Sequence, residues 1–92
     1  MNERYEIRVY IAGMTASARR TLGNLEKLRE RLPKDLALEV RVINILEDPQ
    51  VAEDERVIAT PMVVKHRPEP VRRIIGDLSS ETDALAGLDL DF

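Results

Sequence analysis

The chain has 92 residues, of which 43% are hydrophobic and 34% are charged, and its net charge is −3. These values are typical of one small globular domain, and the acidic balance argues against a nucleic-acid-binding surface. No cysteine is present, which excludes disulfides, thiolate catalysis and zinc–thiolate sites. We expect a cytoplasmic protein, because no apolar run of about 18 residues could span a membrane and the N-terminus lacks the apolar core of a signal peptide.

The first two predicted elements are a strand and a helix. Apolar and polar side chains alternate over residues 5–11, which is the pattern of a strand with one buried face. Apolar residues then recur at spacings of three and four over 18–32, which predicts an amphipathic helix. Thr15 or Ser17 is placed to cap its N-terminus, and Pro33 ends it.

The next predicted strand covers residues 36–46. Its side chains alternate at first, but residues 42–46 are nearly all apolar, which predicts a strand covered on both faces. The strand, helix and strand form a βαβ half over residues 1–47, for which we expect a right-handed crossover.

The second half, residues 48–92, predicts a helix, two strands and a last helix within the same single domain. Asp48 followed by Pro49 is a typical helix start. The expected ranges are a helix from 49 to 57 or 58, strands at 62–65 and 71–75 around a proline-containing turn at 66–70, and a helix at 81–86 capped by Ser79 or Ser80. The order β-α-β-α-β-β-α is that of an α/β, thioredoxin-like fold without redox cysteines.

Three local features resemble the thioredoxin fold. Pro61 leads directly into a strand, as the cis-proline of that fold does, and residues 76–79 open the last helix in a similar way. Residues 12–18 occupy the position of the two active cysteines, but this chain has Thr15 and Ala18 there. The resemblance therefore implies the scaffold without its redox chemistry, and a redox enzyme is disfavoured.

The sequence also resembles the KaiB family of small clock proteins, which bind the ATPase KaiC. The most specific match is the ten-residue segment Pro70–Ser79, and further matches lie at 9–15, 48–55, 58–61 and 87–90. They follow one another in order over nearly the whole chain. The sequence departs from the family at Ala16, where proline is usual.

The KaiB resemblance implies a regulatory protein, not an enzyme, that binds a KaiC-type ATPase and modulates its phosphorylation and ATPase cycle. It implies a homo-oligomer, dimer or tetramer, and a histidine kinase that senses the KaiB fold as a second partner. No cofactor, metal, nucleic acid or membrane is expected. The alternative is a thioredoxin-fold adaptor in stress response or signalling without a clock role. In the KaiB family several basic positions face the partner. The basic residues of this chain at such family positions, and hence its candidate partner contacts, are Arg20, Arg56, Lys65, Arg72 and Arg73.

KaiB proteins are metamorphic, so the resemblance also implies a second state. That state has the order βαββααβ, rearranges residues 48–92 and forms a tetrameric ground state. Residues 88–92 alternate apolar and acidic side chains like a strand although they directly follow a predicted helix, and this conflict fits two folds of similar energy. Alternatively, a glycine simply ends the helix there. The residues associated with the switch are Pro61, Pro68, Pro70, Gly87 and Asp89.

One acidic cluster and one histidine could carry chemistry, but each has a simpler interpretation. Glu53, Asp54 and Glu55 follow the Asp48 cap, and carboxylates there are typical of a solvated helix. His66 is the only histidine and has no evident base or metal ligand beside it, so we expect an exposed turn residue.

Slow isomerisation of the Thr60–Pro61 bond is a hypothesis for how the two folds would interconvert slowly.

Overall fold

The helices and strands follow the predicted order. The computed structural model describes residues 4–90. Its elements are β1 (Arg4–Ile11), α1 (Ala16–Glu30), β2 (Ala37–Asn44), α2 (Pro49–Asp54), β3 (Met62–Arg67), β4 (Arg72–Ile75) and α3 (Glu81–Gly87). The thioredoxin-like β-α-β-α-β-β-α order is therefore confirmed.

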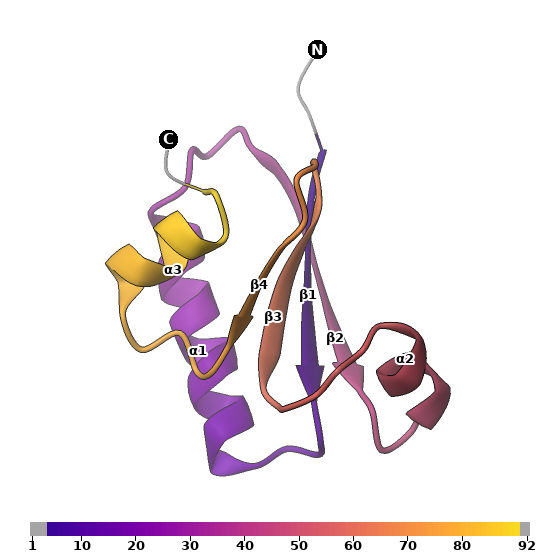
Figure 1. Ribbon diagram of the computed structural model, residues 1–92. Helices are drawn as coiled ribbons and strands as arrows, with labels where there is room; N and C mark the ends of the chain where they lie inside the picture. The colour runs from indigo at the N-terminus through magenta and orange to yellow at the C-terminus, as the bar shows by residue number, and fades with distance from the viewer. Residues whose placement is uncertain (1–3, 91–92) are drawn as a thin grey trace.

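The four strands form one mixed sheet in the order β2-β1-β3-β4. β1 pairs in parallel with β2 and antiparallel with β3, and β4 is antiparallel to β3. Figure 1 shows α1 and α3 together on one face of this sheet, while α2 lies on the other side near the end of β2. The two faces of the sheet are consequently covered to very different extents, and we call the face without α1 and α3 the open face.

The main core lies between the sheet and the two helices α1 and α3. Strand periodicity sends Ile7, Val9 and Ile11 of β1 to this side, where all three are buried. Burying one aliphatic side chain of this size stabilises the fold by about 1.5–3 kcal/mol. The other buried members of the cluster are Ala18, Leu25, Leu28, Leu32, Val63, Leu78, Ala84, Leu88 and Leu90.

A smaller apolar cluster lies on the open face. Tyr10, Met62 and Val64 are buried there, and α2 packs against them through Val51 while Val57 covers them from the segment that follows. No residue of α2 is itself buried. This helix is therefore held by partly exposed side chains.

The prediction that residues 42–46 are covered on both faces is wrong. The strand ends at Asn44, and the side chains of Val42 and Leu46 are 48% and 67% exposed. The physical reason is that β2 is an edge strand of the sheet. The chain turns after it because the Asn44 side chain accepts hydrogen bonds from the backbone N–H groups of Gly13 and Leu46, at 3.0 and 3.1 Å.

α2 is shorter than predicted because its end is built by a residue in a left-handed conformation. Arg56 has a φ of 54°, and the Val57 N–H donates to the Ala52 carbonyl at 2.8 Å. This hydrogen bond is typical of the Schellman motif, in which glycine is the usual left-handed residue. Sequence periodicity carries no signal for this ending when arginine takes the place of glycine.

The turn after β3 is also shorter than predicted, because His66 and Arg67 belong to the strand. The register with β1 shifts between Glu6 and Ile7, so that β3 has one extra residue at this point, which is a β-bulge. His66 is thus a half-buried strand residue and not an exposed turn residue. The peptide bonds before Pro61, Pro68 and Pro70 are all cis.

Residues 88–90 end a helix and do not form a strand. Leu88 and Leu90 are both buried in the main core, which accounts for their apolar alternation. Asp89 between them has a φ of 56°, and the Leu90 N–H donates to the Leu85 carbonyl at 2.8 Å, which is again a Schellman-type ending. The last two residues of the predicted strand pattern, 91–92, lie outside the described residues.

The cap of α1 provides a direct test of this fold. The Thr15 hydroxyl accepts the Ala18 N–H at 3.0 Å, so Thr15, and not Ser17, is the cap. We expect Thr15→Ala to lower the free energy of unfolding by about 1 kcal/mol, measured by urea denaturation followed by circular dichroism. The matched control Ser17→Ala should change it by less than about 0.5 kcal/mol. Equal effects of the two substitutions would contradict this assignment.

Candidate partner-binding surface

The five basic residues predicted to contact a partner lie in separate parts of the structure. Arg20 is on α1, Arg56 follows α2, Lys65 is on β3, and Arg72 and Arg73 are adjacent on β4. Neighbouring strand residues point to opposite faces, so even Arg72 and Arg73 do not share one. No single basic patch results.

Lys65 is in the interior, which differs from its predicted role at the surface. Its side chain is only 2% exposed, and its Nζ lies 3.6 Å from Oδ2 of Asp89, whose side chain is 59% exposed. Strand periodicity turns Lys65 toward the helix layer, where α3 ends. In this conformation the Lys65 cation therefore forms an ion pair with another residue of the same chain, and this pair links β3 to the end of α3.

Arg20 makes a second internal contact. Its Nε donates to Oδ2 of Asp77 at 3.2 Å, and the Asn24 side chain donates to the Asp77 carbonyl at 2.7 Å. The hydrogen bond from Arg20, with further ones from Ser79, lowers the pKa of the Asp77 carboxyl. These contacts join α1 to the segment between β4 and α3.

The remaining three predicted residues are available at the surface. Arg56, Arg72 and Arg73 are exposed, and none has a carboxylate oxygen within 4.0 Å among residues 4–90. By contrast, Arg8 and Arg41 are paired with glutamates. Unpaired exposed arginines are common anchors at protein interfaces.

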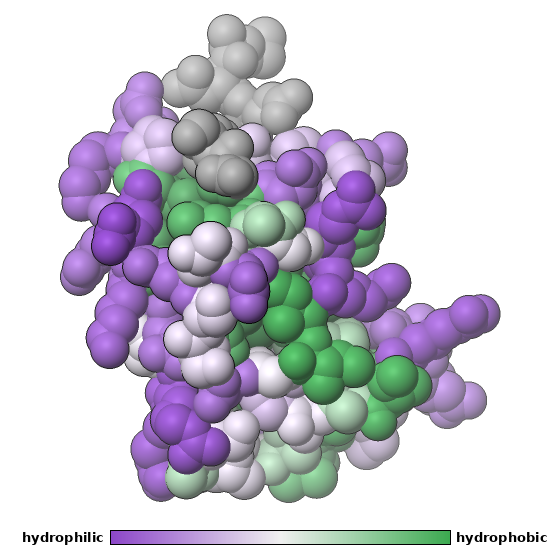
Figure 2. Space-filling view, turned by 60° about the vertical axis from the view of Figure 1, so that its left-hand side comes forward, coloured by the Kyte–Doolittle hydropathy of each residue, from purple (hydrophilic) through white to green (hydrophobic). Residues whose placement is uncertain are grey.

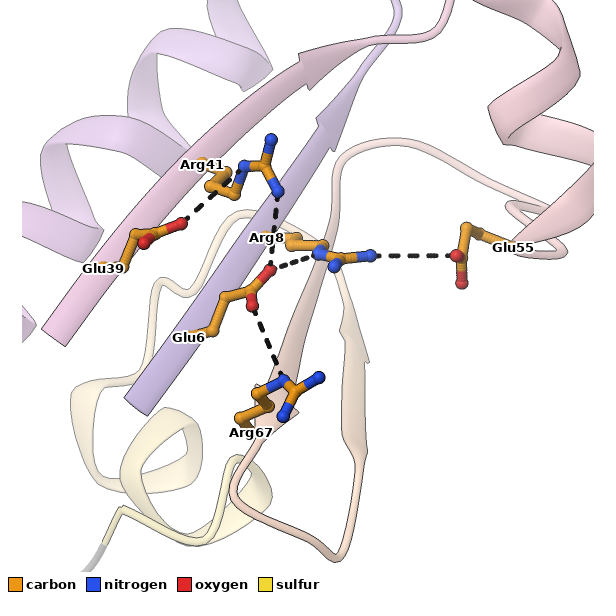
Figure 3. Close-up of polar contacts among 6 residues, drawn as sticks. All are labelled: Glu6, Arg8, Glu39, Arg41, Glu55 and Arg67. Carbon is orange, nitrogen blue, oxygen red and sulfur yellow. Dashed lines mark hydrogen bonds and ion pairs between the residues drawn. The ribbon is translucent and has the colours of Figure 1, made fainter. Parts of the chain in front are cut away.

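Sequence reasoning missed a charged cluster on the open face (Figure 3). Glu6 lies at its centre: Arg8 donates a hydrogen bond to its carboxylate, and Arg41 and Arg67 each approach to 4.0 Å. Arg8 also reaches Glu55 beyond the end of α2, at 3.7 Å. The signal was present in the sequence, because Glu6 and Arg8 are the polar members of the alternating pattern of β1.

The electrostatics of this cluster favour ionised Glu6. The hydrogen bond from Arg8 is the main cause that lowers the pKa of Glu6, and partial burial opposes it. The same contact raises the pKa of Arg8. Ion pairs around Glu6 therefore stabilise one end of the open face. The other end of this face, around Tyr10, is apolar.

Several large apolar side chains are exposed, and two of them lie two positions along the chain from an unpaired arginine. Ile58, just after Arg56, is 83% exposed, and Ile75, at the end of β4, is 53% exposed. Figure 2 brings forward the side of the molecule on which Figure 1 draws α1 and α3, and it shows apolar side chains gathered into a patch among polar ones. The other large apolar residues in this class are Met14, Val42, Leu46 and Val71. Exposed apolar groups beside unpaired arginines are suited to docking a protein.

The segment at the position of the thioredoxin cysteines has structural tasks here. Thr15 caps α1 and Ala18 is buried in the core. Within residues 4–90 no three side chains of metal-ligating type come together. No described helix has both the length and the apolarity needed to cross a bilayer.

Most of the chain matches a known protein family. A family model described as the KaiB domain matches residues 8–90. The chain belongs to the KaiB family. Curated relatives named circadian clock oscillator protein KaiB include one from Prochlorococcus marinus subsp. pastoris, 43% identical over 96% of this chain and 81% of that protein. One from Thermostichus vulcanus is 41% identical over 98% of this chain and 82% of the relative.

Solved structures confirm the thioredoxin-like fold of this KaiB-family chain. The N-terminal domain of SasA from Synechococcus elongatus has a TM-score of 0.74 at 19% identity, covering 94% of this chain and 79% of that one. Mitochondrial thioredoxin 3 from Saccharomyces cerevisiae has a TM-score of 0.73 at 20% identity, and the match covers 99% of this chain and 81% of the thioredoxin chain. At these identities the likeness shows the fold alone.

The Lys65–Asp89 ion pair can be tested by a double-mutant cycle. Asp89→Asn keeps a residue that tolerates the left-handed conformation but leaves the buried Lys65 cation without its counter-charge, so we expect a loss of roughly 1–3 kcal/mol in the free energy of unfolding. Lys65→Met removes the buried charge and should cost less. In the Lys65→Met background, Asp89→Asn should have almost no further effect. Additive effects, measured by urea denaturation, would contradict the pairing.

The Glu6 cluster predicts a pH-dependent contribution to stability. The pKa of Glu6 is depressed below 4.5, so its contribution is complete at neutral pH and is lost as the pH falls through that depressed value. We expect Glu6→Gln to unfold more easily than the wild type at about pH 7, with the difference in unfolding free energy shrinking toward about pH 3. The more exposed Glu39 provides the control, and Glu39→Gln should have a smaller effect. A difference for Glu6→Gln that does not vary with pH would overturn this prediction.

Proposed function

We propose that this chain binds a KaiC-type ATPase and modulates its phosphorylation and ATPase cycle within a clock or timer, as a binding protein and not as an enzyme. The observation that carries the proposal is the KaiB-domain match over residues 8–90, with relatives named as circadian clock oscillator proteins. The unpaired Arg56, Arg72 and Arg73 beside exposed apolar side chains support a docking role.

Arg56 is the strongest candidate for the contact with the ATPase. It is exposed and unpaired, and its left-handed backbone conformation costs an arginine roughly 1–2 kcal/mol that a glycine would avoid. Local strain of this kind is often retained where a side chain is needed for function. The neighbouring Ile58, almost fully exposed, would supply apolar contact area.

The proposal includes a second conformation, in which residues 48–92 rearrange to the order βαββααβ within a dimer or tetramer. Such a change would have to break the Lys65–Asp89 pair and remove Leu88 and Leu90 from the main core. It would also separate Gly87 from Ile74, which is so close that an added Cβ at Gly87 would lie 2.9 Å from Ile74 Cδ1. An ATPase that binds only the thioredoxin-like state would then shift the population toward it. A histidine kinase that senses the KaiB fold is the proposed second partner.

The test is binding to a purified KaiC-type ATPase in each of its nucleotide states, measured by size-exclusion chromatography and calorimetry. We expect a complex whose affinity depends on the nucleotide state. Arg56→Gly should weaken it about tenfold while keeping or raising the stability of the free chain, so that lost binding is not lost folding. Arg29→Ala changes an exposed arginine on α1 that has no carboxylate oxygen within 4.0 Å among residues 4–90, and this variant should bind like the wild type.

The outcomes separate the two functional classes. No complex in any nucleotide state would overturn the ATPase proposal and favour an adaptor in stress response or signalling. Equal losses for Arg56→Gly and Arg29→Ala would leave the ATPase as the partner but contradict the assignment of Arg56 to the contact.

A further inference from the structure

Within the part of the chain that the structure describes, residues 4–90, no strand lies beside the outer edge of β4. β4 is the last strand in the sheet order and pairs only with β3. A free edge presents backbone N–H and C=O groups that can pair with another extended chain. Which groups these are follows from the hydrogen-bond pattern of the sheet.

Two hydrogen bonds fix that pattern from opposite sides of the sheet. The Gly76 N–H donates to the Pro61 carbonyl at 3.0 Å, so residues of β4 in step with Gly76, namely Ile74 and Arg72, direct their backbone groups toward β3. At the other side, the Ile45 N–H donates to the Ile11 carbonyl at 2.8 Å, and propagating this register across β1 and β3 gives the same result.

The outward-facing backbone groups of β4 therefore belong to Arg73 and Ile75. Their side chains lie on the open face, because they pair in register with Val64 and Met62, which belong to the apolar cluster there. Arg72 lies on the opposite face of the strand. An incoming strand would thus meet an arginine on each face and an exposed isoleucine on one.

The charge of this edge selects its partner. Arg72 and Arg73 have no carboxylate within 4.0 Å among the described residues, whereas at the other edge, on β2, Arg41 approaches Glu39 at 3.8 Å. Two copies of β4 side by side would bring these arginines against one another, and like charges on adjacent strands destabilise the pairing. A second copy of this chain is therefore disfavoured at this edge, and an acidic strand is favoured.

We propose that β4 accepts an extended, acidic segment of a partner protein by strand addition. The segment pairs with the backbone groups of Arg73 and Ile75, places carboxylates near Arg72 and Arg73 on the two faces of the sheet, and places an apolar side chain against Ile75. This is a surface additional to that of Arg56, and it does not require the partner to be the ATPase.

Amide hydrogen exchange followed by NMR tests the geometry. In the free chain, the amides of Arg73 and Ile75 should exchange quickly while those of Arg72 and Ile74 are protected by β3. The probe is a short synthetic peptide with two adjacent acidic residues, one for each face of the sheet, and a β-branched residue two positions from one of them, so that it lies on the same face as that acidic residue. Its addition should slow exchange at Arg73 and Ile75 by at least about tenfold and leave Arg72 and Ile74 nearly unchanged.

Variants separate backbone pairing from simple charge attraction. Arg73→Pro removes an outward N–H and should abolish binding of the peptide, while Arg73→Ala keeps that N–H and should weaken binding only in part. Should Arg73→Pro fail to fold, the wild type with a peptide N-methylated at alternate amides makes the same test, and binding should again be lost. A peptide with lysine in place of each acidic residue should not bind.

Three results would overturn the proposal. One is peptide binding without added protection at Arg73 and Ile75. Another is undiminished binding of the N-methylated peptide, which would show that the backbone edge is not used. The third is equally tight binding of a short single-stranded oligonucleotide, which would show that any polyanion satisfies the arginines. None of these measurements involves the ATPase, so a failure of the proposed function would leave them unaffected.

Discussion

The structure depends above all on the burial of β1 at the centre of the sheet. Ile7, Val9 and Ile11 are almost completely buried beneath α1 and α3, and β1 pairs with a strand on each side. A one-residue slip of β1 would turn all three side chains to the open face, so the register of β2 and β3 is fixed by this burial. The edges of the four-stranded sheet then fall to β2 and β4, so the backbone groups that a further strand could pair with belong to these two strands.

The two faces of the sheet are stabilised by different means. The buried residues on the helix side are apolar except for Thr21 and Lys65, and the charge of Lys65 is balanced by Asp89 at the end of α3. The open face is apolar only around Tyr10 and is otherwise held by the arginines around Glu6. Ion pairs exposed to solvent contribute little compared with buried apolar side chains. α2, which adds only Val51 to this face, is therefore attached more weakly than α1 or α3.

Periodicity and capping were enough to predict all seven elements, because strand and helix patterns are local. What the sequence could not supply depends on neighbours in space. Val42 and Leu46 read as buried, but their strand is at an edge. The sequence predicted Lys65 to be a surface cation, but strand alternation and the end of α3 place its side chain in the interior. The Glu6 cluster needed the pairing of β1 with both β2 and β3, which no local pattern contains.

Left-handed backbone conformations are distributed unequally between the two halves of the chain. Among residues 4–90, the non-glycine residues with positive φ are Arg56, Leu78 and Asp89, and all three fall within 48–92. This conformation costs Arg56 and Leu78 roughly 1–2 kcal/mol each, and Asp89 less, and the packing of neighbouring side chains must offset that cost. In residues 4–47 the positive φ occurs at Gly13, where it is not strained. Because part of the packing energy of residues 48–92 is offset by this backbone cost, this half lies closer in free energy to other arrangements. This supports placing the proposed rearrangement in residues 48–92 and not in the βαβ half.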